Sequence, residues 1–290
     1  MPRDDIGAAY LVSTEWAAQN LRSAGLRFVE VDVDTAAYQT GHLPGAVGFN
    51  WQTQLNSSVR RDIPTVQEME DLLSSHGIAN DTSILLYGDN NNWFAAYAFW
   101  LLNYYGHDKV RLIDGGRKKW LAEGRPLDTA TVSYPRSDYR VARINRQLRV
   151  KRDDVLQAVE RSSANLVDVR SPAEFRGEII APPGMSETAQ RGGHIPGALN
   201  VPWSEAVNED GTFKASKALA ALYESRGLDP TRETVAYCRI GERSSHTWFV
   251  LKHLLGYDNV RNYDGSWTEY GNLIDVPIEK GDARPSAAAS

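Results

Sequence analysis

The residue types best suited to chemistry gather in one loop, Cys238-Arg-Ile-Gly-Glu-Arg243. The loop joins a predicted buried strand over 234–237 to a predicted helix, so its backbone N–H groups should point inward at the positive end of the helix dipole. Cys238 is the only cysteine among the 290 residues. Beside Arg239 and Arg243, its thiol should ionise easily and act as a nucleophile. The sequence therefore predicts an active site at Cys238.

The alternative is that Cys238 is a buried small hydrophobic residue, as single cysteines often are. Its position favours a reactive thiol, because it ends a strand, opens a glycine-containing loop and is flanked by charges. The N–H groups of this loop, including those of Ile240 and Gly241, could also bind an anion carried on the sulfur. Glu242 also contributes its N–H to this loop, but its carboxylate is unfavourable beside an anion unless it is paired. We expect its side chain to be turned outward or bonded to an arginine.

The composition is that of an ordinary globular protein, with 42% hydrophobic and 24% charged residues. Its length allows two domains. The net charge of −5 and the pI of about 5.7 argue against nucleic acid or an anionic membrane as partner. One cysteine permits no internal disulfide, and no Cys/His cluster suits a metal. The longest apolar run, over 93–102, is too short to span a bilayer, and the first residues lack a signal-peptide pattern. We expect a cytoplasmic protein.

The chain contains two copies of one unit. Three pairs of segments match in the same order along the sequence: 28–32 with 166–170, 41–46 with 193–198, and 106–115 with 256–265. The spacing between partners grows from 138 to 152 residues, so the second copy carries 14 more residues around 177–191. Chance does not produce three ordered matches of this kind.

Each copy alternates predicted strands and helices, which predicts an α/β fold with a mostly parallel sheet flanked by helices. We expect four regions: a first domain over 1–125, a polar linker over 126–147, a second domain over 148–280 and a disordered tail over 281–290. At a spacing of 150, Cys238 aligns with Gly88. The first copy therefore lacks the nucleophile, and we expect only the second to be catalytic.

At this point the chain resembles a tandem-domain rhodanese, a thiosulfate sulfurtransferase of the actinobacterial type. The resemblance covers nearly the whole chain and rests on four features: Val-Asp-Val-Arg-Ser-Pro-Ala-Glu-Phe175, Gly-His-Ile-Pro-Gly-Ala198, the loop from Cys238 to Arg243, and Asp-Gly turns at 114 and 264. It implies two rhodanese-like domains, the first inactive. It also implies that Cys238 takes the outer sulfur of thiosulfate as a persulfide and passes it to cyanide or a thiol, without metal or organic cofactor.

Several further residues are weaker candidates. Arg243 matches a position where such rhodaneses keep a substrate-contacting arginine, and Arg239 adds a second cation for a dianionic donor. Arg176 and Arg191 bracket the insertion and could fold toward the loop.

Other residues are expected to have structural roles. Asp168 and Arg170 should hold the active loop rather than react. His42 and His194 lie in Gly-His-x-Pro-Gly turns, where we expect them to satisfy backbone groups. Trp93 and Phe94 either present aromatic rings to the cleft, as in tandem rhodaneses, or form ordinary core.

Three other functions stay open. The first is 3-mercaptopyruvate sulfurtransferase, although those loops usually read Cys-Gly, and Arg239 favours the doubly charged thiosulfate. The second is a phosphatase or arsenate reductase with a Cys-x5-Arg loop. Only four residues separate Cys238 from Arg243, and a loop shorter by one residue suits a sulfur atom better than a phosphate. The third is a non-catalytic sulfur-carrier partner.

Overall fold

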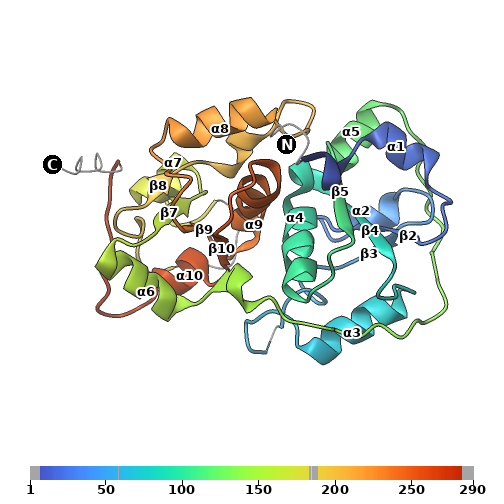
Figure 1. The fold of residues 1–290 in the computed structure, drawn as a ribbon, viewed down its shortest axis with the longest axis horizontal. Coiled ribbons are helices and arrows are strands. Elements are labelled where there is room, and N and C mark those ends of the chain that lie inside the picture. The colour runs from blue at the N-terminus through green and yellow to red at the C-terminus, as the bar shows by residue number, and fades with distance from the viewer. Residues whose placement is uncertain (1–6, 58, 183, 185–188, 283–290) are drawn as a thin grey trace. The chain divides into compact units, whose positions relative to one another are not determined.

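A computed structural model describes residues 7–57, 59–182, 184 and 189–282 (Figure 1). The chain forms two compact units, one built from 7–146 with 207–213 and the other from 147–206 and from 214 onward. Most of the predicted tail, over 283–290, lies outside the described residues. In the part that is described, no helix has the length and apolar character needed to span a membrane.

The first unit contains a parallel five-stranded sheet in the order β1-β5-β4-β2-β3. Its strands are β1 (Leu11–Val12), β2 (Leu26–Glu30), β3 (Val47–Gly48), β4 (Ser83–Tyr87) and β5 (Val110–Ile113). Its helices are α1 (Thr14–Gln19), α2 (Ala37–Thr40), α3 (Val66–Ser75), α4 (Asp89–Tyr104) and α5 (Gly116–Ala122).

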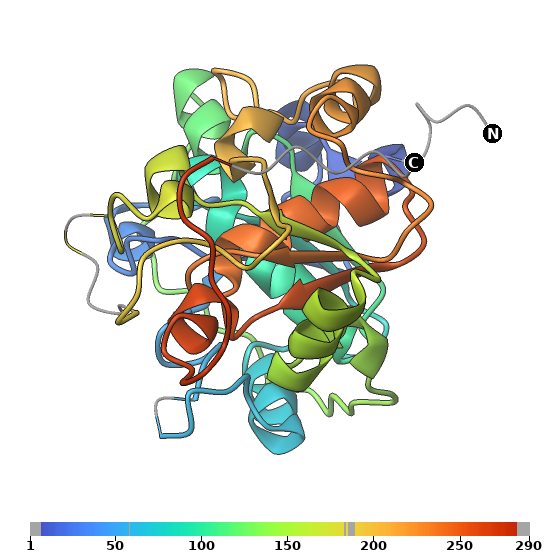
Figure 2. The ribbon, with the colours of Figure 1, turned by 90° about the vertical axis from the view of Figure 1, so that its left-hand side faces the viewer.

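The second unit repeats this topology, with a parallel sheet in the order β6-β10-β9-β7-β8. Its strands are β6 (Arg149–Val150), β7 (Asn165–Asp168), β8 (Leu199–Asn200), β9 (Thr234–Tyr237) and β10 (Val260–Tyr263). Its helices are α6 (Arg152–Arg161), α7 (Pro172–Arg176), α8 (Ser216–Glu224), α9 (Glu242–Phe249), which continues as a π-helical turn over Val250–Leu254, and α10 (Ser266–Tyr270). Figure 2 shows α8 and α9 above this sheet and α6 and α10 below it. The predicted α/β fold class is confirmed.

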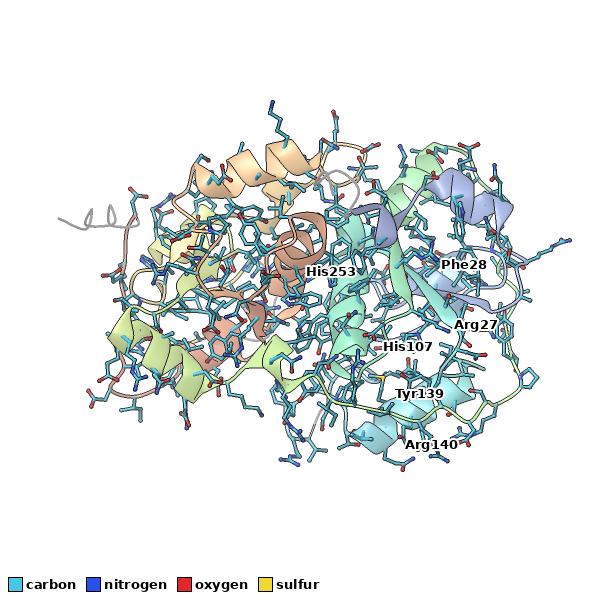
Figure 3. All side chains as sticks on the ribbon, viewed as in Figure 1. Arg27, Phe28, His107, Tyr139, Arg140 and His253 are labelled. Carbon is cyan, nitrogen blue, oxygen red and sulfur yellow. The ribbon has the colours of Figure 1, made fainter. Side chains whose placement is uncertain are left out.

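The segment over 126–147 packs along the first unit. Tyr139 is buried, and its hydroxyl lies 3.3 Å from Nδ1 of His107 at the end of α4 (Figure 3). Tyr134 donates a hydrogen bond to the carbonyl of Gly45. These contacts join the segment to the first unit. The predicted domain boundaries stay predictions.

A buried ion pair fixes the end of β7 in the second unit. Arg170 donates to both carboxylate oxygens of Asp168, at 2.6 to 3.1 Å, and to the carbonyl of Gly193 at 2.7 Å. Both side chains are fully buried. The hydroxyl of Tyr237, the residue before Cys238, accepts the N–H of Ile195. The turn that contains Gly193 is thus tied to the ends of β7 and β9. That Asp168 and Arg170 hold the active loop itself stays a prediction.

The first unit makes the same connection with a different arginine. Glu30 aligns with Asp168, but its partner Arg117 comes from α5, and Arg117 also donates to the carbonyl of Gly41. Tyr87 donates to Glu30 and accepts the N–H of Leu43. Each repeat therefore buries a carboxylate–arginine pair beneath its Gly-His-x-Pro-Gly turn. This framework does not depend on catalysis, because the first repeat keeps it without a nucleophile.

The two turn histidines have the structural surroundings that were predicted. His42 stacks on Tyr38 with its Nδ1 3.0 Å from the Tyr38 carbonyl oxygen. His194 stacks on Phe175 with its Nδ1 2.8 Å from the Phe175 carbonyl oxygen. Both rings are buried within their own unit.

Candidate active site

The thiol of Cys238 lies at the carboxyl end of β9, where the chain turns into α9. The side chain is 0% exposed. Its Sγ accepts the N–H of Gly241 at 3.1 Å and lies 3.7 Å from the hydroxyl of Ser244. The loop thus encloses the sulfur with donors from its own backbone and from the first turn of α9.

The surroundings favour the thiolate. Burial alone raises the pKa of the Cys238 thiol, because a charged group loses its water. The charge of Arg243, the N–H and hydroxyl of Ser244 and the N–H of Gly241 outweigh that effect, and the pKa lies below its ordinary value. A lower pKa increases the fraction of the group that is present as thiolate, which is the nucleophilic form. The geometry therefore agrees with the predicted reactive cysteine.

Arg243 forms a buried ion pair that sequence reasoning missed. Its guanidinium donates to both carboxylate oxygens of Glu174, at 2.9 and 3.0 Å. Glu174 is 0% exposed and Arg243 is 6% exposed. Burial raises the pKa of Glu174, but the hydrogen bonds and charge of Arg243 hold it below its ordinary value. Arg243 is therefore fixed in place beside the thiol by a carboxylate 69 residues away.

Glu174 has a second function that the sequence did signal. Ser171 and Glu174 form a capping box at the start of α7, in which Glu174 accepts the N–H of Ser171 at 3.0 Å. The pattern Ser-x-x-Glu is a standard helix-start signal. It revealed the helix but gave no indication that the carboxylate reaches Arg243.

The remaining loop residues are all buried. Arg239 is 6% and Ile240 5% exposed. The carbonyls of Cys238 and Arg239 accept the N–H groups of Trp267 and Thr268 at the start of α10, at 3.0 and 2.9 Å. These two carbonyls therefore face α10, while the N–H of Gly241 faces the sulfur.

Glu242 corrects one expectation. Its side chain is 2% exposed at the first turn of α9, so it is not turned outward. The neighbouring loop residues Arg239 and Ile240 are buried as well, so this part of the loop is not at the surface. Pairing with an arginine, the other expectation for Glu242, stays a prediction.

Ser266 is another residue that sequence reasoning missed. Its hydroxyl accepts the N–H of Cys238 at 3.1 Å and donates to the carbonyl of Tyr263 at 2.6 Å. Its φ is +51°, a conformation that side chains other than glycine rarely adopt. The aligned residue of the first repeat is Gly116, with φ +52°. The strained backbone at Ser266 is thus retained where its hydroxyl fixes the nucleophile.

The two arginines that bracket the insertion bind their own neighbourhoods. Arg176 pairs with both carboxylate oxygens of Glu178, at 2.6 and 3.0 Å. Arg191 donates to the carbonyls of four residues near the C-terminal end: Tyr270, Gly271, Leu273 and Val276. These contacts hold the surrounding chain together. They give no support to the prediction that either arginine touches substrate, which stays untested.

The corresponding loop of the first repeat is filled by its own side chains. A Cβ added to Gly88 would lie 2.1 Å from the carbonyl oxygen of Val31. Asn92, which aligns with Glu242, accepts the N–H of Gly88 at 3.0 Å. Asp89 accepts the N–H of Val33 at 2.7 Å. Asn92 thus occupies the N–H of Gly88, and the position of the nucleophile has no room for a side chain.

The aromatic pair of the first repeat divides between two environments. Phe94 is buried and stacks on Trp51 with ring centres 4.3 Å apart. Trp93 is half-buried and stacks on Phe94 at 5.4 Å. Phe94 therefore fits the core alternative.

Residues 13–123 and 151–273 each match the family model of the rhodanese-like domain. The chain belongs to the rhodanese family. The predicted resemblance is confirmed, with the domain present twice. Within the described residues of this rhodanese, no three His, Cys, Asp or Glu side chains gather in a way that could hold a metal ion.

Relatives match over almost their full length. A Mycolicibacterium smegmatis protein named "Putative thiosulfate sulfurtransferase" is 56% identical over 282 residues, which is 97% of this chain and 100% of that protein. A Thermus thermophilus protein named "Sulfur carrier protein TtuD" is 53% identical over 276 residues, 94% of this chain and 97% of the relative. The structure of SseA from Escherichia coli, described with the 3-mercaptopyruvate sulfotransferases, has a TM-score of 0.79 at 27% identity over 89% of this chain and 98% of that one.

Replacing both members of the Arg243–Glu174 pair should raise the pKa of Cys238. The double variant E174Q/R243Q removes the cation that favours the thiolate, and the glutamine at 174 still serves the capping box. We expect the alkylation rate of the only cysteine to rise with pH along a curve shifted upward by about one unit. Alkylation with iodoacetamide across pH measures this.

The matched control is E205Q/R226Q, which removes an exposed pair whose nearest atoms lie 3.0 Å apart in the same unit. Its alkylation profile should equal that of the wild type. An unshifted profile in E174Q/R243Q would contradict the assignment of Arg243. The single variant R243Q is less informative, because leaving Glu174 buried without its partner would cost about 3 kcal/mol of stability.

A cysteine placed in the first repeat should not create a second active site. The variant G88C forces a Cβ against the Val31 carbonyl, so we expect about 2 kcal/mol of destabilisation in urea unfolding. In a C238S background, G88C should give no sulfur transfer, and G88A should be destabilised to a similar extent. Sulfur transfer by the double variant G88C/C238S would show that the first loop retains a functional cradle.

Proposed function

We propose that the chain is a thiosulfate sulfurtransferase that works through a persulfide on Cys238. The thiolate attacks the outer sulfur of thiosulfate and forms a new S–S bond. The S–S bond of thiosulfate breaks, and its electron pair leaves with sulfite. The observation that carries the proposal is the buried single thiol, whose pKa is lowered by Arg243 and by N–H and hydroxyl donors of its own loop.

The second half of the reaction regenerates the thiolate. A thiophilic acceptor, cyanide or a thiol, attacks the outer sulfur of the persulfide and leaves with that atom, while the electron pair of the broken S–S bond returns to Cys238. The persulfide is itself an anion. The N–H groups of Ile240, Gly241 and Glu242 are the proposed donors to it, and Arg239 and Arg243 are the proposed source of positive charge for donor and sulfite.

The comparisons support this reaction class. Relatives more than half identical to this chain are named "Putative thiosulfate sulfurtransferase", and their alignments span almost the whole chain. The likeness to SseA supports 3-mercaptopyruvate as the alternative donor. The name of the Thermus thermophilus relative supports a protein acceptor as a second candidate for the sulfur. We also propose a cytoplasmic location, because a reducing compartment keeps a single reactive thiol free. Arg176 also stays a proposed substrate contact.

Incubation with thiosulfate should add one sulfur atom to Cys238. Intact mass spectrometry should show this gain in the wild type, and cyanide should reverse it with release of thiocyanate, because the persulfide is the reaction intermediate. The variant C238S is the control and should show neither change. Wild-type protein that stays unmodified by thiosulfate, or thiocyanate production that persists in C238S, would overturn the proposal.

The identity of the donor is tested separately. We expect kcat/KM to be higher for thiosulfate than for 3-mercaptopyruvate, because Arg239 stands next to the nucleophile and favours the dianion. Release of sulfite and of pyruvate measures the two reactions side by side. A clearly higher kcat/KM for mercaptopyruvate would assign the chain to the alternative. The variant R239G, which introduces the Cys-Gly sequence of 3-mercaptopyruvate sulfurtransferase loops, should reduce the preference for thiosulfate.

A further inference from the structure

An asparagine occupies the middle of the sheet in the second repeat, where the first repeat has leucine. Asn262 lies on β10, which pairs with β6 on one side and β9 on the other, and its side chain is 0% exposed. The aligned Leu112 on β5 is also fully buried. Burying an amide costs free energy unless its hydrogen bonds are made, so the fold alone gives no reason for Asn262.

Both ends of this amide are bonded to residues around the active loop. Its Nδ2 donates to the carbonyl of Gly241 at 3.1 Å and to the hydroxyl of Ser245 at 3.0 Å. Its Oδ1 accepts the hydroxyl of Ser244 at 2.7 Å. A carbonyl can only accept, so the contact with Gly241 fixes which end of the amide carries the nitrogen.

The first repeat lacks this network along with the nucleophile. The positions of Ser244, Ser245 and Asn262 are occupied there by apolar residues, namely Phe94, Ala95 and Leu112. All three are buried. The duplication thus acts as an internal control, because the same sheet and helix form without the polar residues. The network is therefore present in the repeat that has the cysteine and absent from the repeat that lacks it, although both have the same fold.

Gly241 connects the network to the sulfur. Its N–H donates to Sγ of Cys238 at 3.1 Å, while its carbonyl oxygen lies 2.9 to 3.1 Å from donors on Ser244, Ser245 and Asn262. Its φ of +96° suits glycine, and a Cβ there would lie 2.6 Å from Cα of Asp264. The backbone around Gly241 is therefore held from both sides, with one N–H aimed at the nucleophile.

Ser244 gives the network a second connection. Its hydroxyl has one proton and lies near three acceptors: the Gly241 carbonyl at 3.0 Å, Oδ1 of Asn262 at 2.7 Å and Sγ of Cys238 at 3.7 Å. When the sulfur becomes an anion, it becomes the strongest acceptor of the three. Asn262 holds the hydroxyl within reach of the sulfur in either state.

We propose that Asn262 is a positioning residue that sets the reactivity of Cys238. It acts through the Gly241 peptide, whose N–H points at the sulfur before any charge develops there, and by holding the Ser244 hydroxyl beside the sulfur. The effect on the thiolate is independent of the substrate, and the effect on the persulfide rests on the proposed function.

The test replaces Asn262 with the residue of the first repeat. In N262L we expect the midpoint of the pH profile for iodoacetamide alkylation of Cys238 to rise by about one pH unit. We expect kcat for thiosulfate to fall about tenfold with little change in KM, because the side chain bonds to the loop from behind. Circular dichroism establishes that the variant is folded.

A second variant guards against loss of the fold. N262D has the same shape, but its carboxyl group cannot donate to the Gly241 carbonyl and Ser245 together. Whether it is ionised and repels the thiolate or is protonated with one donor in place of two, the midpoint should rise. The matched control is N165L, which removes another buried amide of the same sheet, bonded to the Asp229 carbonyl and Thr234. It should lower Tm and leave the midpoint unchanged.

Two outcomes would overturn the proposal: a folded N262L or N262D with the midpoint and kcat of the wild type, or an equal shift of the midpoint in N165L. The alkylation measurement tests the role of Asn262 independently of the proposed sulfur-transfer reaction. Wild-type protein that gains no sulfur from thiosulfate, together with a shifted midpoint in N262L, would refute the proposed function and retain the role of Asn262.

Discussion

Keeping a sulfur anion away from water is costly unless donors and positive charge replace the lost solvent. At Cys238 these come from four places: the N–H of Gly241, the N–H and hydroxyl of Ser244, and the guanidinium of Arg243. Each is itself fixed by something else. Glu174 holds Arg243, and Asn262 holds the other two residues. The site is thus a small charged centre whose supports come from α7 and β10 as well as from the loop.

The two repeats separate what the fold needs from what the chemistry needs. Both keep a buried carboxylate–arginine pair beneath the Gly-His-x-Pro-Gly turn, although the arginine is Arg170 in one and Arg117 in the other. Because the arginine comes from a different sequence position in each repeat, we infer that the fold itself requires the ion pair. The loops, in contrast, differ in kind. In the first, Asn92 accepts the N–H of Gly88 and Asp89 accepts the N–H of Val33. In the second, the N–H of Gly241 donates to the sulfur of Cys238.

Sequence reasoning reached the parts of this molecule that are local in the chain. The strand–loop–helix around Cys238, the duplication and the parallel sheets all follow from patterns within short windows or from self-comparison. Glu174 and Asn262 were missed because each acts on a residue far away in sequence, 69 and 21 positions from its loop partner. A capping-box or strand pattern does not predict which distant group a side chain will contact. For Glu242 two expectations were open, an outward side chain or a bond to an arginine, and its burial excludes only the first.

The pairing of Arg243 also limits how the site can attract its donor. Because Glu174 balances the guanidinium, the pair adds no net charge, and the chain as a whole carries −5. Long-range attraction of a dianion is therefore weak. At short range the charge of Arg243 still favours the thiolate. It acts together with oriented N–H and hydroxyl groups, which are effective because they are already aligned. The reactivity of such a site therefore depends on how firmly Glu174 holds Arg243 and on how firmly the Gly241 peptide is held beside the sulfur.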